Sequence, residues 1–352
     1  MANARSDLFV QHIRDGVLAG DGAIGTLLYE RGIGIHVNAD SLNLDRADQI
    51  GAIHEEYISA GAQLIETNTY GANRFKLAKF GLEKKTREIN LAGARIARKA
   101  AGEEVFVAGA VGPLAPTEIG GGPVRKEEQV RKAFEEQVIA LAEGGVDLIL
   151  LETFSDLDEI LIALDVAKEK TDLPVGCQLA FVERGRTVQG AEAVDALGRL
   201  EKAGAAFVGT NCGRGPKAAT GVIEKMGQAS QLPLSAFPNA GFPQFLGGRY
   251  YYLMTPEYLA ESAKDLVAAG ANLIGGCCGT TPNEIRVMAR AIRGMKPAAR
   301  KIVSAPPAEP LRKTSEAAPP EPHFLDPGRP GPLILAEIDP PKGMRTKKSL
   351  EG

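Results

Sequence analysis

Three of the four cysteines in this chain of 352 residues lie at the ends of apolar runs, where their spacing suits metal binding. Cys212 ends the run FVGTNC, and Cys277 and Cys278 are neighbours in LIGGCCGTTP. Neighbouring side chains face opposite sides of a straight strand, so both sulfurs can face one point only where the strand stops and the chain turns. The glycines that flank the pair permit such a turn. We therefore predict that the three sulfurs converge.

Three thiolates favour Zn²⁺ over a hard cation, because hard cations prefer oxygen ligands. No histidine stands at a predicted strand end, and the fourth cysteine, Cys177, lies inside the apolar run PVGCQLAF, where we expect it to pack in the core. Three protein ligands leave the fourth position of a tetrahedral zinc site open, which is typical of catalytic zinc.

A zinc site so rich in thiolate is a poor Lewis acid for hydrolysis, but it can bind the sulfur of a substrate as a thiolate. The cysteine pattern therefore predicts alkyl transfer to a thiol, with Zn²⁺ as the cofactor. A redox enzyme that uses the vicinal pair is an alternative, which the strained ring of a disulfide between neighbours disfavours.

Polar residues at other predicted strand ends fit a substrate that carries an amino-acid group. Glu152, in LLETFSD, could hold an ammonium group, unless it forms an ion pair at the rim of the fold. Asp21 and Gly22, in DGAIGT, could turn a carboxylate inward and offer backbone N–H groups to a substrate carboxylate. The pair DG is also a common turn signal, so a simple turn is the alternative there.

Further short polar groups stand in ETNTYGAN and TNC. Thr67 is a candidate substrate contact, and Asn211 is predicted to brace the neighbouring Cys212 or to contact substrate. Tyr70 either covers the metal in the absence of substrate or packs at the rim.

Four nearly identical phrases show where helices give way to strands: SAGAQLIETN, EGGVDLILLET, KAGAAFVGTNC and AAGANLIGGCC. Each glycine suits the left-handed position that ends a helix, and each apolar run suits a parallel strand buried on both faces. Extending this pattern predicts eight strands, which begin near Val17, Gln63, Val105, Asp147, Val175, Ala206, Leu234 and Asn272.

Eight βα units in about 300 residues predict an α/β protein with a (β/α)8 TIM barrel, in which functional residues gather at the carboxyl ends of the strands. All the candidate residues above stand at such ends. A doubly wound open sheet is the alternative, but no G-x-G-x-x-G motif follows the first predicted strand.

The overall composition excludes several classes of function. The chain is 44% hydrophobic and 24% charged, with a net charge of −3, so it has no electrostatic footprint for nucleic acid or an anionic membrane. No apolar run approaches the roughly 20 residues that span a bilayer. The N-terminus lacks the apolar stretch of a secretory signal. We expect a cytoplasmic protein whose cysteines are thiols or metal ligands.

The barrel pattern is predicted to cover residues 1–300. Half of the 22 prolines lie in the last 52 residues, and residues 301–332 are predicted to form an extended Pro-rich linker without a core of its own. An apolar run, LILAEI, follows within residues 333–352, and the chain then stops in what is predicted to be the start of a helix.

The motifs DGAIGT, ETNTYGAN, GPLAPT, LLETFSD, TNC and GGCCGTTP, in this order, resemble the homocysteine S-methyltransferase family over residues 8–297. The resemblance implies a zinc-binding barrel, with Cys212, Cys277 and Cys278 as ligands and the sulfur of homocysteine as the fourth. It also implies that Glu152 and Asp21 contact the amino-acid end of the substrate. The expected reaction is transfer of a methyl group to homocysteine, which forms methionine.

The methyl donor is left open by the sequence. Methylfolate, methylcobalamin and S-methylmethionine are preferred over betaine, because a chain without Trp cannot build a tryptophan cage for a quaternary ammonium. A non-catalytic homocysteine-binding module is a further alternative.

The segment LILAEIDPPKGMRTKKSLEG is similar to the first strand and helix start of methylenetetrahydrofolate reductase. That resemblance implies that Glu337 is the proton donor near the flavin, and that the chain is the N-terminal part of a bifunctional homocysteine methyltransferase and reductase. FAD is then expected only in the missing reductase part, which could also act as a separate partner.

Overall fold

A computed structural model describes residues 4–34, 36–114, 125–183, 185–241, 244–246, 249–303, 333–338 and 346–351. The chain divides into one unit formed by Met1–Phe242 and Met254–Ser304, and a second formed by Pro243–Leu253 and Ala305–Gly352. The eight strands of the predicted barrel lie in the first unit.

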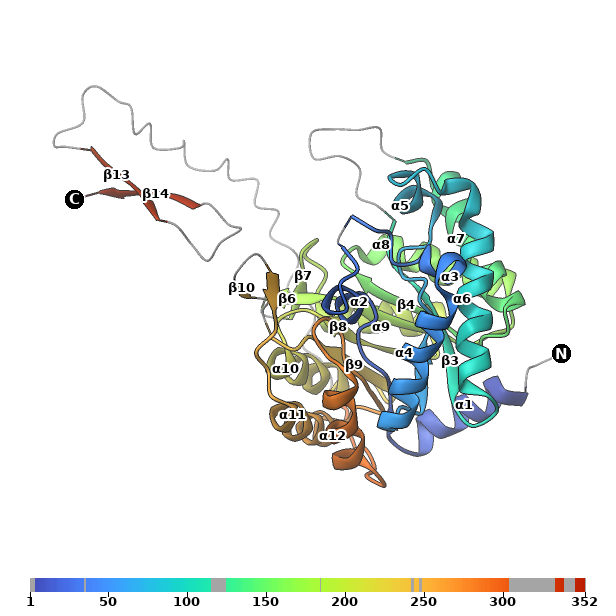
Figure 1. The fold of residues 1–352 in the computed structure, drawn as a ribbon. Helices are drawn as coiled ribbons and strands as arrows, with labels where there is room; N and C mark the ends of the chain where they lie inside the picture. The colour runs from blue at the N-terminus through green and yellow to red at the C-terminus, as the bar shows by residue number, and fades with distance from the viewer. Residues whose placement is uncertain are drawn as a thin grey trace. The chain divides into compact units, whose positions relative to one another are not determined.

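Eight parallel strands form the sheet of the first unit (Figure 1). They are β1 (Leu18–Ala19), β2 (Leu64–Glu66), β3 (Phe106–Val111), β4 (Leu148–Phe154), β5 (Val175–Leu179), β8 (Phe207–Cys212), β9 (Leu234–Pro238) and β12 (Leu273–Ile274). The order across the sheet is β1-β12-β9-β8-β5-β4-β3-β2, and a parallel bridge between Gly20 and Leu64 joins its two edges. The predicted (β/α)8 barrel is confirmed, and each strand begins within one residue of its predicted start.

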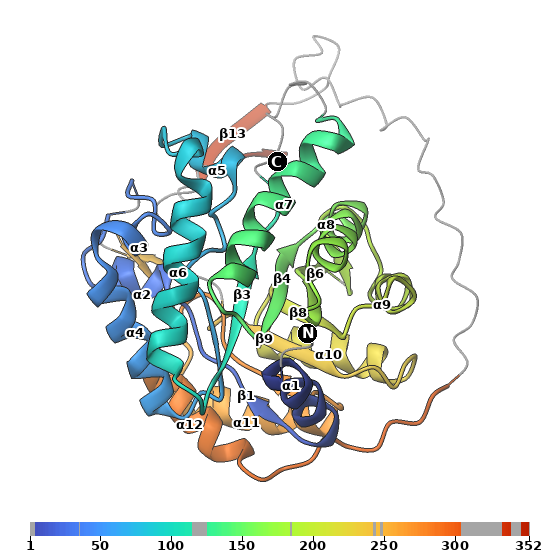
Figure 2. The ribbon, with the colours of Figure 1, turned by 90° about the vertical axis from the view of Figure 1, so that its right-hand side faces the viewer.

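Helices surround these strands (Figure 2). They are α1 (Ala4–Asp15), α2 (Gly25–Glu30), α3 (Leu42–Asp45), α4 (Ala47–Ala60), α5 (Arg74–Ala78), η1 (Glu83–Lys85), α6 (Thr86–Ala101), α7 (Glu127–Glu143), α8 (Leu157–Lys170), α9 (Ala193–Ala203), α10 (Pro216–Gly227), α11 (Pro256–Ala268) and α12 (Pro282–Ile292). The sequence pattern did not predict two short hairpins, β6 (Phe181–Glu183) with β7 (Arg186–Thr187), and β10 (Gln244–Leu246) with β11 (Arg249–Tyr251).

Glycines at the four repeated junctions have the predicted left-handed conformation. Gly61, Gly145, Gly204 and Gly270 have φ angles of 107°, 88°, 91° and 103°. A side chain at such a φ angle would meet the backbone, so glycine lets the helix stop and the next strand start at once.

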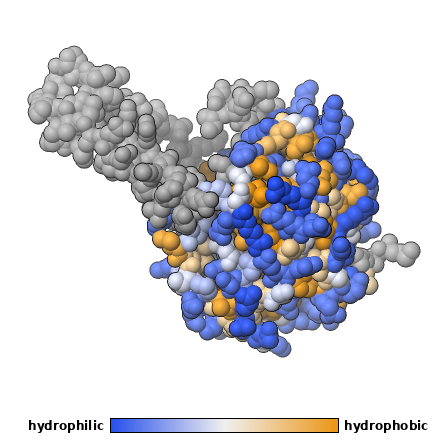
Figure 3. All heavy atoms as spheres, viewed as in Figure 1, coloured by the Kyte–Doolittle hydropathy of each residue, from blue (hydrophilic) through white to orange (hydrophobic). Residues whose placement is uncertain are grey.

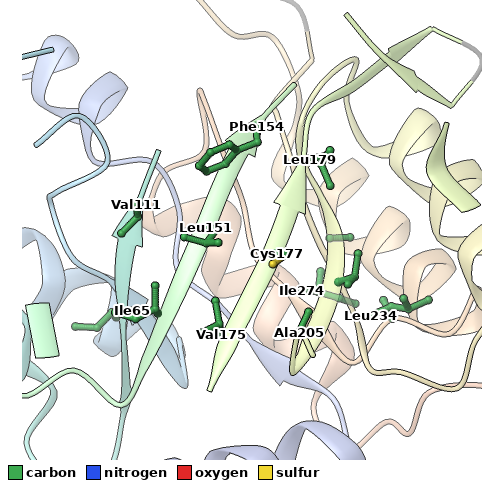
Figure 4. Packing of buried hydrophobic residues seen from close by; sticks show 14 of the residues in the cluster. Ile65, Val111, Leu151, Phe154, Val175, Cys177, Leu179, Ala205, Leu234 and Ile274 are labelled. Atoms are coloured by element: carbon green, nitrogen blue, oxygen red, sulfur yellow. The ribbon is translucent and has the colours of Figure 1, made fainter. Parts of the chain in front are cut away.

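The strands are buried on both faces, as their continuous apolar runs predict. On the outward face, Val175, Cys177 and Leu179 of β5 pack with the helices in one large cluster. Figure 4 shows Cys177 among the apolar side chains of neighbouring strands. Its thiol is fully buried, and burial raises its pKa, so the predicted packing role of Cys177 is confirmed.

Helix α1 packs against the amino-terminal end of the barrel interior. Phe9 packs edge-to-face on Phe106 and Phe207, with ring centroids 5.4 and 5.8 Å apart, and Ile13 joins the same cluster. Both partner rings belong to the first residues of their strands, so α1 closes the amino-terminal end of the barrel and leaves the carboxyl ends for the site.

Hydrophilic and hydrophobic residues are interspersed on the face of the molecule shown in Figure 3. Among the described residues, no helix is both long and apolar enough to cross a lipid bilayer. In the second unit, β13 (Leu333–Ile338) matches the predicted strand.

The predicted helix start after β13 is wrong. Residues Thr346–Glu351 form strand β14, which pairs antiparallel with β13. A lone strand has unpaired N–H and C=O groups on both edges, and the next extended segment can satisfy one of these edges. Of the predicted linker at residues 301–332, residues 304–332 lie outside the described residues.

Substitution of Asp147 should destabilise the barrel strongly. Its carboxylate is 1% exposed and accepts hydrogen bonds from Arg5 Nε at 2.9 Å, from Arg98, and from the backbone N–H of Val107 at 2.8 Å. Asp147→Ala leaves these buried donors without an acceptor, and we expect a loss of about 3 kcal/mol in the free energy of unfolding.

Denaturant unfolding of the purified variant measures this loss. The control is Asp158→Ala, which removes an exposed ion pair with Arg199 and should cost less than about 1 kcal/mol. Equal losses in the two variants would contradict a structural role for the buried carboxylate.

Candidate metal and substrate site

The sulfur atoms of Cys212, Cys277 and Cys278 all lie within 4.8 Å of one another. Each side chain is only partly exposed, and all three line a cavity of about 420 Å³ at the carboxyl ends of the strands. Three sulfurs at this separation could hold one metal ion, so the convergence expected from the sequence is present in the structure.

The vicinal pair is held between the ends of two strands and not on a free loop. The backbone N–H of Cys277 donates to the carbonyl of Pro238 at 2.9 Å, and the N–H of Ala240 donates to the carbonyl of Cys278 at the same distance. The sheet hydrogen bonding therefore continues past β12 to the two cysteines.

Thr280 closes the turn that carries the pair. Its hydroxyl donates to the carbonyl of Cys277 at 2.7 Å, and its backbone N–H donates to the same carbonyl at 3.1 Å. A Cβ atom on Gly276 would lie 2.7 Å from the Cβ of Thr280, closer than real Cβ contacts. The glycine before the pair is thus required by close packing.

Strained backbone marks the ends of β4 and β8. Within the described residues, only Thr153 and Cys212 have a positive φ without being glycine, at 59° and 58°. Asn211 ties the two positions together, because its side-chain oxygen accepts from the N–H of Thr153 at 2.8 Å. Its amide nitrogen donates to Glu152 at 3.0 Å and to the hydroxyl of Thr153 at 2.6 Å. Such strain persists only where surrounding contacts enforce it, and it clusters at functional sites.

Hydrogen bonds join the three cysteine side chains. Hydrogen bonds from Cys277 and Cys278 lower the pKa of Cys212, and Asn239 contributes in the same direction. The contact with Cys212 raises the pKa of Cys277. One sulfur is therefore ready to be a thiolate, which is the form of cysteine that binds metals.

Carboxyl groups gather beside the sulfurs. Burial raises the pKa of Glu152 to about 7, and burial also raises the pKa of Glu66, followed by repulsion from Glu152 and Asp21. A side-chain hydrogen bond joins Glu66 to Glu152, so the two groups share a proton. One oxygen of Glu66 is buried without a partner. This arrangement leaves acceptors for an ammonium group.

The predicted substrate residues occupy different places around the cavity. Gly22, Thr67, Glu152 and Asn211 line it. Asp21 is not among the lining residues, since its carboxylate is buried and accepts the backbone N–H of Glu66 at 2.9 Å.

The remaining polar groups are already engaged within the barrel. The hydroxyl of Thr67 pairs with that of Thr69 at 2.6 Å and accepts from the N–H of Ala110. Tyr70 borders the cavity, with Lys76 Nζ 4.0 Å from its ring centroid. Burial, followed by the nearby carboxylate and thiols, raises the pKa of Tyr70.

The sequence reasoning missed two residues of the site. Glu66 ends a buried strand, and that position was the available signal for a functional carboxyl. Asn239 follows β9 in FPNAG; its amide donates to the carbonyl of Gly213 at 3.0 Å, while its side-chain oxygen is buried without a partner. Nothing in the local sequence distinguished Asn239 from an ordinary turn residue.

The structure is a (β/α)8 barrel in which three convergent thiols and buried carboxyl groups border one cavity. It is therefore a barrel protein with a candidate metal site made of thiolates. The sequence profile of the family described as Homocysteine S-methyltransferase matches residues 18–292. The chain therefore belongs to the homocysteine S-methyltransferase family.

Similar proteins agree with this assignment. The chain is 33% identical over 296 residues to a methionine synthase of Mycobacterium leprae, and 31% identical over 304 residues to one of Mycobacterium tuberculosis. The matches cover 78% and 81% of this chain but only 24% and 25% of those relatives, so the chain spans about a quarter of their length.

A solved structure gives the same result. The homocysteine methyltransferase MmuM from Escherichia coli, in its metallated form, matches with a TM-score of 0.66 and 26% identity. The match covers 78% of this chain and 96% of that one. Its oxidized form matches with a TM-score of 0.65.

Gly276→Ala should weaken metal binding, because the added methyl group displaces Thr280 and the turn that it closes. We expect the affinity for Zn²⁺ to fall about 10-fold or more, in the range seen when groups that orient metal ligands are changed. Gly221→Ala is the control, since nothing lies within 4 Å of a Cβ there. Competition with a chromophoric chelator measures both affinities. Unchanged Zn²⁺ binding by Gly276→Ala would contradict the conclusion that close packing of Gly276 on Thr280 positions the two cysteines.

The carboxyl pair should make stability depend on pH. A carboxyl whose pKa is raised by folding contributes stability that is complete below its unfolded pKa, near 4.5, and is lost as the pH rises through its folded pKa, about 7 for Glu152. Glu66→Gln removes one of the two coupled acids. The loss in unfolding free energy between pH 5 and pH 8 should therefore shrink by about 1–2 kcal/mol.

Denaturant unfolding at the two pH values tests this expectation. Glu224→Gln, on the exposed side of α10, is the control and should leave the pH dependence unchanged. A parallel pH dependence for wild type and Glu66→Gln would show that the pair does not share a proton.

Proposed function

We propose that the chain transfers a methyl group to the thiol of homocysteine and forms methionine, with Zn²⁺ held by Cys212, Cys277 and Cys278. The observation that carries this proposal is the approach of three sulfurs within 4.8 Å of one another beside a cavity of substrate size. The metal, the residue roles and the donor go beyond family membership and are proposals.

The residues fit a zinc ion on two grounds. Three cysteines form a soft donor set, and three protein ligands leave a position for substrate. The side chain of Asn239 hydrogen-bonds Cys212, and its buried oxygen has no partner, which is a state that a native site rarely leaves uncompensated. When bound, Zn²⁺ would keep a coordinated thiol deprotonated yet nucleophilic at neutral pH.

The amino-acid end of homocysteine would bind on the acidic side of the cavity. Glu152 and Glu66 offer carboxyl oxygens to its ammonium group, and Asn211 holds Glu152 in place. Asp21 would act indirectly, because its carboxylate accepts the backbone N–H of Glu66 and so holds Glu66 in position. Backbone N–H groups after Gly22, at the start of α2, would meet the substrate carboxylate.

These contacts would place the substrate sulfur beside the three thiols and in line with the methyl group of a donor. The substrate sulfur forms a bond to the methyl carbon while the bond between that carbon and the donor breaks. The electron pair of the broken bond stays on the donor. Tyr70 and Thr67 border the cavity, with Tyr70 near the thiols, and would limit access of water. Methylfolate, methylcobalamin and S-methylmethionine remain the preferred donors over betaine.

A methylenetetrahydrofolate reductase, fused or separate, is a candidate partner because it would supply methylfolate. In that case FAD belongs to the reductase, and Glu337 in β13 would serve that activity and not methyl transfer. We also propose that the protein works in the cytoplasm, where its thiols stay reduced.

Two other functions make different predictions. A redox enzyme would show the same number of titratable thiols with and without a chelator, whereas zinc binding protects them until the metal is removed. A non-catalytic binding module would bind homocysteine without forming methionine from any donor. Both outcomes can be measured on the same preparation.

Cys212→Ser should abolish metal binding and activity together. We expect zinc content to fall below about one tenth of an equivalent and methionine formation to fall about 10³-fold or more, since ligand loss removes thiol activation. Cys177→Ala is the matched control, because Cys177 is buried outside the site and should leave both quantities nearly unchanged.

Metal analysis and a methionine assay on the same samples give both readouts. Full activity in a metal-free preparation, or in Cys212→Ser, would refute the proposed role of the three sulfurs.

A further inference from the structure

A short turn in the wall of the cavity carries Tyr70. The turn, residues 69–72, comes after strand β2, and it is closed by the backbone N–H of Ala72, which donates to the carbonyl of Thr69 at 3.0 Å. Thr69, Tyr70 and Gly71 all line the cavity. The conformation of this turn therefore decides where the ring of Tyr70 lies.

Two buried amide side chains hold the turn from helices outside the barrel. Gln137, on α7, donates its side-chain amide to the carbonyl of Thr69 at 2.7 Å. Asn90, on α6, donates its side-chain amide to the carbonyl of Ala72, also at 2.7 Å. Both amides are fully buried, and neither residue is among those that line the cavity. Two different helices thus hold the two ends of one turn with the same chemical group.

Each of these amides leaves its oxygen unpartnered. Asn90 Oδ1 and Gln137 Oε1 are buried and have no hydrogen-bond partner among the described residues. A buried acceptor without a partner destabilises a protein, because it has lost its hydrogen bonds to water. An apolar side chain of the same shape would avoid this loss if packing were the only role of the position. The donors that the amides supply to the turn therefore explain their presence.

Further contacts fix the tip of the turn and the ring that it carries. The N–H of Gly71 donates to Asp40 at 3.0 Å, and the carbonyl of Tyr70 accepts the N–H of Gly112 at 3.1 Å. A Cβ atom on Gly112 would lie 2.3 Å from Cε2 of the Tyr70 ring, and Lys76 Nζ lies 4.0 Å from the ring centroid. Tyr70 is thus held at the cavity through its backbone and through its ring.

Resting on the proposed methyl transfer to homocysteine, we propose that Asn90 and Gln137 are positioning residues, which hold Tyr70 in the cavity wall so that the substrate sulfur and the methyl group meet in line. Their effect passes through the turn to the ring. Misplacement by about 1 Å can slow a reaction about 10²-fold, even when the substituted residue is far from the chemistry.

The two amides should govern turnover more than affinity. In the proposed complex the ammonium group of homocysteine binds to Glu66 and Glu152, and neither of these carboxyl groups belongs to the turn. A displaced Tyr70 therefore leaves the main substrate contacts in place and changes only how well the reacting atoms are aligned.

Gln137→Met keeps the length of the side chain and removes both polar atoms of the amide. We expect kcat for methionine formation to fall about 10-fold or more, while KM and Kd for homocysteine change less than about threefold. Asn90→Leu is a second variant with the same expected result, so the test does not depend on the folding of one protein. Thr86→Val is the matched control, because Thr86 is fully buried on α6 and its hydroxyl donates to a backbone carbonyl outside the turn, that of Glu83, at 2.9 Å.

Fluorine NMR reports on Tyr70 without any activity. In the full chain labelled with 3-fluorotyrosine, Tyr70→Phe identifies which of the signals from the seven tyrosines belongs to Tyr70. We expect Gln137→Met to shift or broaden that signal and Thr86→Val to leave it unchanged. In a Tyr70→Ala background, Gln137→Met should have no further effect on kcat, because the ring through which it acts is already absent.

The outcomes separate this inference from the proposed function. Equal losses of kcat in Gln137→Met and Thr86→Val, or an unchanged Tyr70 signal in Gln137→Met, overturn the positioning role and leave methyl transfer intact. A full loss of kcat from Gln137→Met in the Tyr70→Ala background overturns the claim that Gln137 acts through Tyr70. Absence of methionine from the wild type with every donor overturns the proposed function, and the fluorine signal then still decides whether the amides hold Tyr70.

Discussion

The site depends on the parallel register of three neighbouring strands, β8, β9 and β12. Cys212 is the register partner of Pro238, and the carbonyl of Pro238 also accepts the N–H of Cys277. The middle strand therefore fixes both cysteine motifs from one residue. Because side chains alternate along a strand, a slip of one residue in either pairing would turn a sulfur away from the cavity. The metal chemistry is thus a consequence of sheet register.

Several features of this arrangement destabilise the protein locally. Cys212 and Thr153 adopt a backbone conformation that non-glycine residues rarely take, and acidic side chains are buried close together with raised pKa values. Each feature costs stability, and each lies within the same few strand ends. The large apolar cluster between strands and helices, and the buried ion pairs of Asp147, lie away from the site and offset these costs.

The sequence predicted the parts of the fold that follow from local chemistry. Glycines such as Gly61 and Gly204 ended helices in the left-handed conformation, and apolar runs placed all eight strands. Cys212 and the vicinal pair were found because sulfur is rare in the chain and stands at strand ends. Asn239 acquires its role only through distant partners, so its local sequence gave no specific signal. The prediction of a helix after β13 was wrong for the same reason, because pairing with β13 makes this segment a strand.

Helix α1 has a consequence for how the chain reaches its native state. Phe9 leaves the ribosome well before the rings of Phe106 and Phe207 that bury it are made. During synthesis the apolar face of α1 therefore stays exposed until strands from both halves of the chain have assembled. Contacts so distant in sequence form slowly, and exposed apolar surface promotes aggregation in the meantime. We therefore expect nascent chains of this protein to depend on chaperones until β8 has been translated.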